Sequence, residues 1–81
     1  MNTRRMQCIG EHLRRERRIR DKTLEQVADA VGLKKNTISA YEKGKISIPI
    51  DNLDAVCQYL GIDYLDLLIE VQKELRGENH E

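Results

Sequence analysis

The chain has 81 residues, of which 40% are hydrophobic and 35% are charged, and its formal net charge is zero. A chain of this length forms one small domain that buries about 60–65% of the surface of its unfolded state. It contains no apolar run near the roughly 18 residues that cross a bilayer and no signal-peptide core. These features exclude a membrane protein, and we expect a soluble cytoplasmic one.

The cysteines and histidines do not suggest a metal site. Cys8 and Cys57 are 49 positions apart and belong to no C-x-x-C pair. We therefore expect reduced thiols, with neither a disulfide framework nor a zinc site. His12 and His80 are too isolated in the sequence to indicate metal ligation. We expect no metal and no other cofactor.

Zero net charge hides an uneven distribution of charge along the chain. Residues 1–45 contain 12 Lys or Arg and 6 Asp or Glu, a net charge of +6. Residues 46–81 contain 2 Lys or Arg and 8 Asp or Glu, a net charge of −6. Such a chain can turn a basic face to phosphates and keep an acidic face away from them. The alternative is that these charges only solvate helix surfaces.

Apolar periodicity predicts five helices and no strand, which makes this an all-α domain. The helices are expected at about residues 6–20, 24–31, 35–43, 50–60 and 64–75. We assign residues 1–76 to a single domain, with residues 63–76 as its fifth helical segment. Residues 77–81 are expected to form a flexible tail.

The first expected helix carries an apolar stripe that an arginine interrupts. The stripe runs through Met6, Ile9 and Leu13, and Arg17 lies one helical step further on. An arginine buried at that position needs a counter-charge. For the neighbouring arginines, solvated surface is the simpler interpretation; these are Arg14, Arg15, Arg18 and Arg20.

Residues 23–44 are the most informative part of the chain. Thr23 is a good N-cap with Gln26 at the capping-box position, and an apolar helix face follows it, formed by Leu24, Val27, Ala28 and Val31. Gly32 ends this helix because a residue without Cβ adopts the left-handed conformation cheaply. The apolar face resumes at Leu33, Ile38 and Tyr41. Helices this short must pack together to be stable, which leaves the polar start of the second helix facing outward.

This pattern resembles the Cro/phage-repressor type of helix-turn-helix, a family whose members include examples used to define the motif. The resemblance extends from about Ile9 to Leu68. It rests on matching positions in the two helices and the turn, which are Val27, Ala28, Gly32, Leu33, Ile38 and Tyr41. The trailing residues Glu42, Lys43, Gly44 and Lys45 match the family's E-x-G-K pattern. The resemblance implies a compact five-helix, repressor-like DNA-binding domain.

The resemblance also implies which side chains contact bases. In this family the first turn of the second helix and a position one turn further lie against base edges, which here are Lys35, Asn36, Thr37 and Ala40. Lysine can donate to guanine, asparagine can pair with adenine, and the methyl groups of threonine and alanine can contact thymine. The alternative is an ordinary polar first turn, although two lysines at a helix N-terminus oppose the helix dipole unless an anion compensates them.

Backbone contacts and a structural ion pair complete the implied site. Phosphate contacts are expected from Thr23, Lys34, Lys43 and Lys45. The family often has glutamine where this chain has Leu24, which cannot donate a hydrogen bond. Many relatives form a partly buried ion pair at the positions of Arg17 and Glu42. We expect Arg17 to orient the recognition helix through Glu42 without touching DNA.

The last two helices are expected to close the core and to form an oligomer. Pro49 suits the start of the helix at 50–60, which buries Leu53, Val56, Cys57 and Leu60. In the fifth helix apolar residues surround too much of the surface for one buried face. A stripe at Tyr64, Leu68, Val71 and Leu75 suits a helix–helix seam. We expect Leu65, Ile69 and Gln72 in a dimer interface; the alternative is that all of these pack within one monomer.

The leading hypothesis is a sequence-specific transcriptional regulator from a bacterium, phage or mobile element. It would bind double-stranded DNA as a homodimer on a palindromic operator, with residues 35–43 in the major groove. The alternative is an antitoxin-like module that binds a partner protein through the fifth helix and the acidic C-terminal half. An enzyme is not expected, because no nucleophile, paired acids or phosphate-binding glycine loop can be assembled from these residues.

Overall fold

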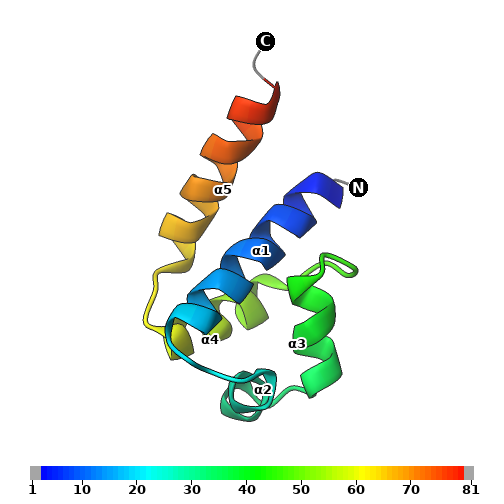
Figure 1. The fold of residues 1–81 in the computed structure, drawn as a ribbon, viewed down its shortest axis with the longest axis vertical. Coiled ribbons are helices and arrows are strands. Elements are labelled where there is room, and N and C mark those ends of the chain that lie inside the picture. The colour runs from blue at the N-terminus through cyan, green and yellow to red at the C-terminus, as the bar shows by residue number, and fades with distance from the viewer. Residues whose placement is uncertain (1–2, 80–81) are drawn as a thin grey trace.

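Five helices make up the computed structural model, which describes residues 3–79 (Figure 1). They are α1 (Thr3–Ile19), α2 (Leu24–Val31), α3 (Lys35–Glu42), α4 (Ile50–Leu60) and α5 (Tyr64–Asn79). Residues 3–79 contain no strand, which confirms the all-α prediction. Within the same residues, no helix is long and apolar enough to cross a membrane.

The expected helices all form, and three of them differ at their ends. α1 begins at Thr3, three residues before the expected start, and α3 ends at Glu42 with Lys43 as its C-cap. α5 continues through Gly77 to Asn79, so the segment expected to be a flexible tail is helical as far as it is described. A glycine inside a helix costs only about 1 kcal/mol relative to alanine, which the preceding turns of α5 can absorb. Residues 80 and 81, including His80, lie outside the described residues.

α1 is the central element of the fold. It lies beside α5 along the long axis of the molecule and packs on α3 and α4 (Figure 1). α2 packs on α3 and α4 at the end of the molecule opposite the two termini (Figure 1). The side-by-side pairing of α1 with α5 accounts for the elongated shape of 42 × 23 × 21 Å.

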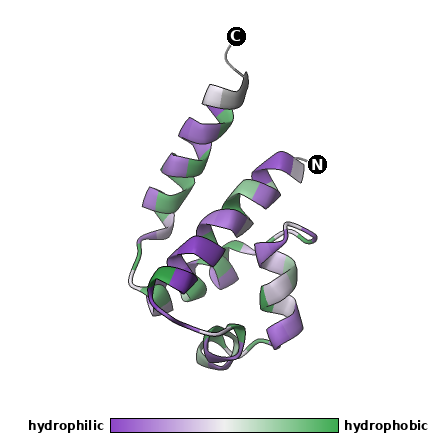
Figure 2. Ribbon diagram, viewed as in Figure 1, coloured by the Kyte–Doolittle hydropathy of each residue, from purple (hydrophilic) through white to green (hydrophobic). Residues whose placement is uncertain are grey.

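The core is aliphatic apart from Tyr41 and the two cysteines, in keeping with a chain that has no Trp or Phe. Each of the five helices contributes to it, and along α5 the hydrophobic positions follow the side nearest α1 (Figure 2). Cys57 lies at its centre with no exposed surface. Burial raises the pKa of the Cys57 thiol to about 11, with smaller contributions in the same direction from Asp54, Asp63 and Glu16. The thiol therefore stays protonated at neutral pH and acts as a small packing group.

Gly10 allows α1 to approach the C-terminal end of α3 very closely. A Cβ at this position would lie 2.4 Å from the carbonyl oxygen of Tyr41 and 2.5 Å from that of Glu42. Both of these atoms belong to the backbone, so a side-chain rotation cannot relieve the contact. No role was expected for Gly10, although a glycine inside an otherwise helical segment is a signal of close packing.

A polar cluster joins α1 to α5 and corrects one expectation. His12 is buried, and its Nε2 atom lies 2.6 Å from Oε2 of Glu74. Cys8 donates from Sγ to Oε1 of Glu74 over 3.4 Å, and Nη2 of Arg15 lies 3.0 Å from Nδ1 of His12. The expectation that His12 is isolated is wrong, because helix packing brings Glu74 to it from 62 positions away. Burial acts to raise the pKa of Glu74, but hydrogen bonds from His12 and Cys8 outweigh it and lower that pKa below its usual value.

Substitution of Gly10 by alanine is expected to destabilise the fold even though alanine is the better helix former. The added methyl group must push α1 away from α3, and overpacking of this kind costs about 1–3 kcal/mol. Urea unfolding followed by circular dichroism measures the loss. The matched control is Gly77→Ala in α5, where a Cβ meets nothing within 4 Å. That variant should gain about 0.5–1 kcal/mol, and equal effects of the two substitutions would contradict the close-approach explanation.

Candidate nucleic-acid interface

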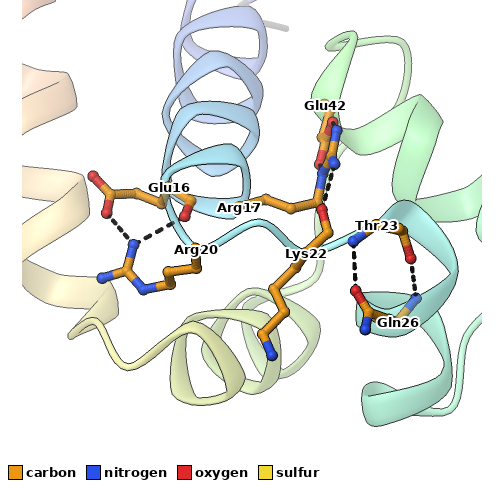
Figure 3. Close-up of polar contacts among 7 residues, drawn as sticks. All are labelled: Glu16, Arg17, Arg20, Lys22, Thr23, Gln26 and Glu42. Atoms are coloured by element: carbon orange, nitrogen blue, oxygen red, sulfur yellow. Dashed lines mark hydrogen bonds and ion pairs between the residues drawn. The ribbon is translucent and has the colours of Figure 1, made fainter.

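α2 and α3 form a helix-turn-helix whose turn is fixed by its own hydrogen bonds. Thr23 accepts a hydrogen bond at Oγ1 from the Gln26 backbone over 3.0 Å, and its backbone N–H donates to Oε1 of Gln26 over 2.8 Å (Figure 3). This capping box fixes the start of α2. Gly32 then ends α2 with φ +72°, and the Leu33 N–H donates to the Ala28 carbonyl over 2.9 Å. Together these bonds set the direction in which the chain enters α3.

The N-terminus of α3 is exposed and has no side-chain cap. Lys34 occupies the N-cap position in an extended conformation, without a capping hydrogen bond from its side chain. The first turn contains no acidic residue, and Lys34, Lys35 and Asn36 are all exposed. Two lysines therefore add to the positive end of the helix dipole instead of balancing it. This arrangement attracts an anion.

The residues expected to contact bases surround the outward side of α3. Ile38 and Tyr41 are buried and face the core. At 100° per residue, Asn36 and Ala40 point away from that buried side, with Lys35 and Thr37 on its two flanks. Of the four, Lys35 and Asn36 are exposed, whereas Thr37 and Ala40 are half-buried.

The expected phosphate contacts lie at both ends of α3 and at the start of α2. Thr23 is exposed and lines a shallow surface groove together with Lys35. Lys43 and Lys45 are exposed in the segment that follows α3. Leu24 is half-buried and packs against the core, which gives a physical reason for an apolar residue at this position.

The structure brings Arg17 and Glu42 together as a two-pronged ion pair. Nε of Arg17 lies 2.7 Å from Oε2 of Glu42, and Nη2 donates to Oε1 over 3.0 Å (Figure 3). Nη1 donates to the carbonyl of Lys22 over 2.7 Å. Only 11% of the Arg17 side chain and 7% of the Glu42 side chain are exposed. The guanidinium thus links α1, the end of α3 and the segment that leads into α2. The sequence did not indicate that the Lys22 carbonyl takes part in this link.

Arg20, which follows the end of α1, forms a separate ion pair. Arg20 donates from Nη1 to the carbonyl and to Oε1 of Glu16, over 2.9 Å and 2.7 Å. Figure 3 shows this pair on the side of α1 away from α3. Arg14 and Arg18 are exposed.

Comparison with known proteins places the sequence of this chain in a family. Residues 13–67 match the helix-turn-helix family. The chain belongs to that family. The match runs from the middle of α1 to the first turns of α5, and it confirms the resemblance to Cro/phage-repressor-type regulators.

Two solved structures of a helix-turn-helix regulator share the fold. Both are of the clp gene regulator ClgR from Corynebacterium glutamicum. One is 26% identical with a TM-score of 0.84, covering 98% of this chain and 82% of the other. The second is 28% identical with a TM-score of 0.79, covering 91% of this chain and 94% of the other. Both neighbours are gene regulators, and the family match identifies this chain as a helix-turn-helix DNA-binding protein.

The chain is also similar in sequence to part of a curated protein. The chain is 32% identical over 62 residues to the antitoxin PezA of Streptococcus pneumoniae serotype 4 (strain ATCC BAA-334 / TIGR4). The aligned part covers 76% of this chain and 39% of the relative. The chain therefore matches about two fifths of the length of that protein.

Substitution of Arg17 by alanine is expected to lower the free energy of unfolding by about 3–5 kcal/mol, because it leaves the buried Glu42 carboxylate without its counter-charge. Chemical denaturation measures this loss. The matched control is Arg20→Ala, which removes a partly exposed ion pair at the C-terminal end of the same helix and should cost about 1 kcal/mol or less. Equal losses in the two variants would contradict a special role for the Arg17–Glu42 pair.

Proposed function

We propose that this helix-turn-helix protein binds a palindromic operator as a homodimer, with one α3 helix in each of two successive major grooves. The observation that carries the proposal is the exposed, uncapped N-terminus of α3, with Lys34, Lys35 and Asn36 at its first turn. In a helix-turn-helix, the second helix packs on the first and exposes its N-terminal turn to the major groove, as α3 does here beside α2.

Base reading is assigned to the outward side of α3. Asn36 can form a bidentate pair with adenine N6 and N7, and Lys35 can donate to guanine O6 and N7. Thr37 and Ala40 supply methyl groups that suit thymine. Asn36 and Ala40 lie opposite the buried side of the helix, so they are the side chains best directed at the floor of the groove.

Phosphate contacts are assigned to Thr23, Lys34, Lys43 and Lys45. These residues lie at the two ends of α3 and at the start of α2. Contacts to DNA phosphates on both sides of a recognition helix hold it in register on the duplex. Leu24 contributes no donor, so the α2 backbone amides and Thr23 carry the contacts on that side. Arg17 is a positioning residue that acts on α3 through Glu42.

The dimer interface is assigned to the outer side of α5. Leu65 and Ile69 are 56% and 53% exposed, one helical turn apart, and Gln72 continues their stripe. The opposite side of α5 is occupied within the monomer by Leu67, Val71 and Leu75. We call Leu65, Ile69 and Gln72 the outer stripe of α5. Two copies of it can pair about a two-fold axis, since an isologous interface uses the same patch on both chains.

The second candidate function is that of an antitoxin, and the similarity to PezA favours it. In that case the outer stripe of α5 would bind a partner protein, and DNA contact would be secondary. Substitutions in α3 distinguish the two functions. Alanine at Lys35, Asn36 and Thr37 would abolish specific DNA binding by a regulator. The same substitutions would leave the complex of an antitoxin with its partner protein intact.

Selection from random double-stranded DNA tests the proposed function. A palindromic consensus is expected, with half-site centres about 34–36 Å apart. Asn36→Ala should cost about 1–3 kcal/mol on that sequence and relax the preference at one base position of each half-site. Binding isotherms at several salt concentrations serve as the control, because phosphate contacts make the affinity fall steeply with salt. An affinity that does not depend on salt, or a selection without a consensus, would contradict the proposal.

Substitution of Leu65 or Ile69 by aspartate is expected to yield a folded monomer, because it buries an unpaired charge in the dimer interface. Sedimentation velocity measures the oligomeric state, and circular dichroism checks the helix content. The matched control is Ile50→Asp, which changes a residue that is 60% exposed at the start of α4. A dimer that survives Leu65→Asp and Ile69→Asp would rule out this interface.

A further inference from the structure

Three side chains that the DNA interface does not use form a cluster between α1 and α5. Cys8 and His12 lie one turn apart on the same side of α1, and Glu74 faces them from α5. One ligand atom from each, a sulfur, an imidazole nitrogen and a carboxylate oxygen, lies within 4.8 Å of the other two. Cys8 and His12 are buried, whereas 47% of the Glu74 side chain is exposed. The cluster is therefore closed on the α1 side and open to solvent at Glu74.

The donor set matches the coordination preferences of one class of metal ion. Thiolate, imidazole and carboxylate together suit zinc and the divalent ions that resemble it, whereas calcium and magnesium take oxygen ligands. Three protein ligands leave a fourth tetrahedral position, which water can fill from the open side.

We propose that Cys8, His12 and Glu74 bind a zinc-like divalent metal ion. With zinc bonds of roughly 2.0–2.1 Å to nitrogen and oxygen, Nε2 of His12 and the Glu74 oxygen must stand about 3.3 Å apart. They are 2.6 Å apart in the structure, so the ion enters by replacing their hydrogen bond. The exposed Glu74 side chain can make this movement of less than one ångström without disturbing the core.

Metal binding changes the protonation of both α1 ligands in a defined way. The Cys8 thiol gives its proton to solvent as the sulfur–metal bond forms. When Nε2 of His12 binds the ion, the ring proton must be on Nδ1. Arg15 lies against both ring nitrogens, with Nη2 3.0 Å from Nδ1 and 3.4 Å from Nε2, and it can only donate hydrogen bonds. Arg15 must therefore turn away, so it competes with the ion.

The surroundings of His12 favour the approach of a cation. His12 also lines an open pocket between α1 and the start of α5, whose wall carries four carboxylates, those of Glu16, Asp63, Asp66 and Glu70. Two of the four are already paired with cations, Glu16 with Arg20 and Glu70 with Lys73, so Asp63 and Asp66 supply the negative charge that attracts a metal ion. Because the ligands come from α1 and α5, the bound ion ties α5 to the centre of the fold.

Titration of the full chain with Co²⁺, without an affinity tag and in the presence of a phosphine reductant, tests this proposal. We expect one Co²⁺ per chain, a sulfur-to-cobalt charge-transfer band in the near ultraviolet, its loss on addition of Zn²⁺, and a rise in melting temperature with either ion. Cys8→Ser should abolish the band. His12→Gln and Glu74→Gln should each weaken Co²⁺ binding by about tenfold or more. Loss of an outer-shell partner already weakens metal binding by about tenfold, and loss of a direct ligand should weaken it at least as much. Arg15→Gln should tighten it.

Matched controls exist for each ligand type. The sequence contains only one other cysteine and one other histidine, so Cys57→Ser and His80→Gln should leave the titration unchanged, as should Glu25→Gln on α2. Helix content is checked for each variant, and the half-exposed Glu74 allows a test even if Cys8→Ser does not fold. No charge-transfer band at millimolar Co²⁺ would overturn the proposal. A band that survives Cys8→Ser, or binding of unchanged strength in Glu74→Gln, would overturn it equally.

Discussion

The ion pair between Arg17 and Glu42 is the interaction on which the geometry of the helix-turn-helix depends. α3 has only eight residues, and a helix of that length has no direction of its own until it is packed. Its C-terminal end carries Glu42, and a single guanidinium connects that carboxylate to α1 and to the Lys22 carbonyl before α2. The angle between α2 and α3 is thus tied to the central helix by one buried group, whose removal would leave an uncompensated charge.

α1 can hold both sides of the molecule because its two faces have different chemistry. One face, with Gly10 and Arg17 seven positions apart, meets the end of α3: the missing Cβ sets the distance and the guanidinium supplies the attraction. The other face, with Cys8 and His12, meets α5. A single helix therefore links the proposed reading surface to the proposed dimer surface, and the spacing of two α3 helices in a dimer would depend on how firmly α5 is held.

Much of the fold could be predicted because its signals are local. Thr23 with Gln26 and the glycine at 32 act within a few residues of the chain, so α2 has the predicted bounds. The interruption of the first apolar stripe likewise marked Arg17 as a residue in need of a partner. Helix ends were less predictable: α5 continues through Gly77, since a glycine lowers helix stability without forbidding the helix.

The sequence by itself determined the helix class, the turn, the polar first turn of α3 and the need for a counter-charge at Arg17, because periodicity and capping operate within about one helical turn. Only the tertiary structure decided which distant groups meet. It showed that Gly10 admits the backbone of α3. It also brought Glu74 to Cys8 and His12. Contacts across 25 to 66 positions depend on the angle at which helices pack, and no local pattern encodes that angle.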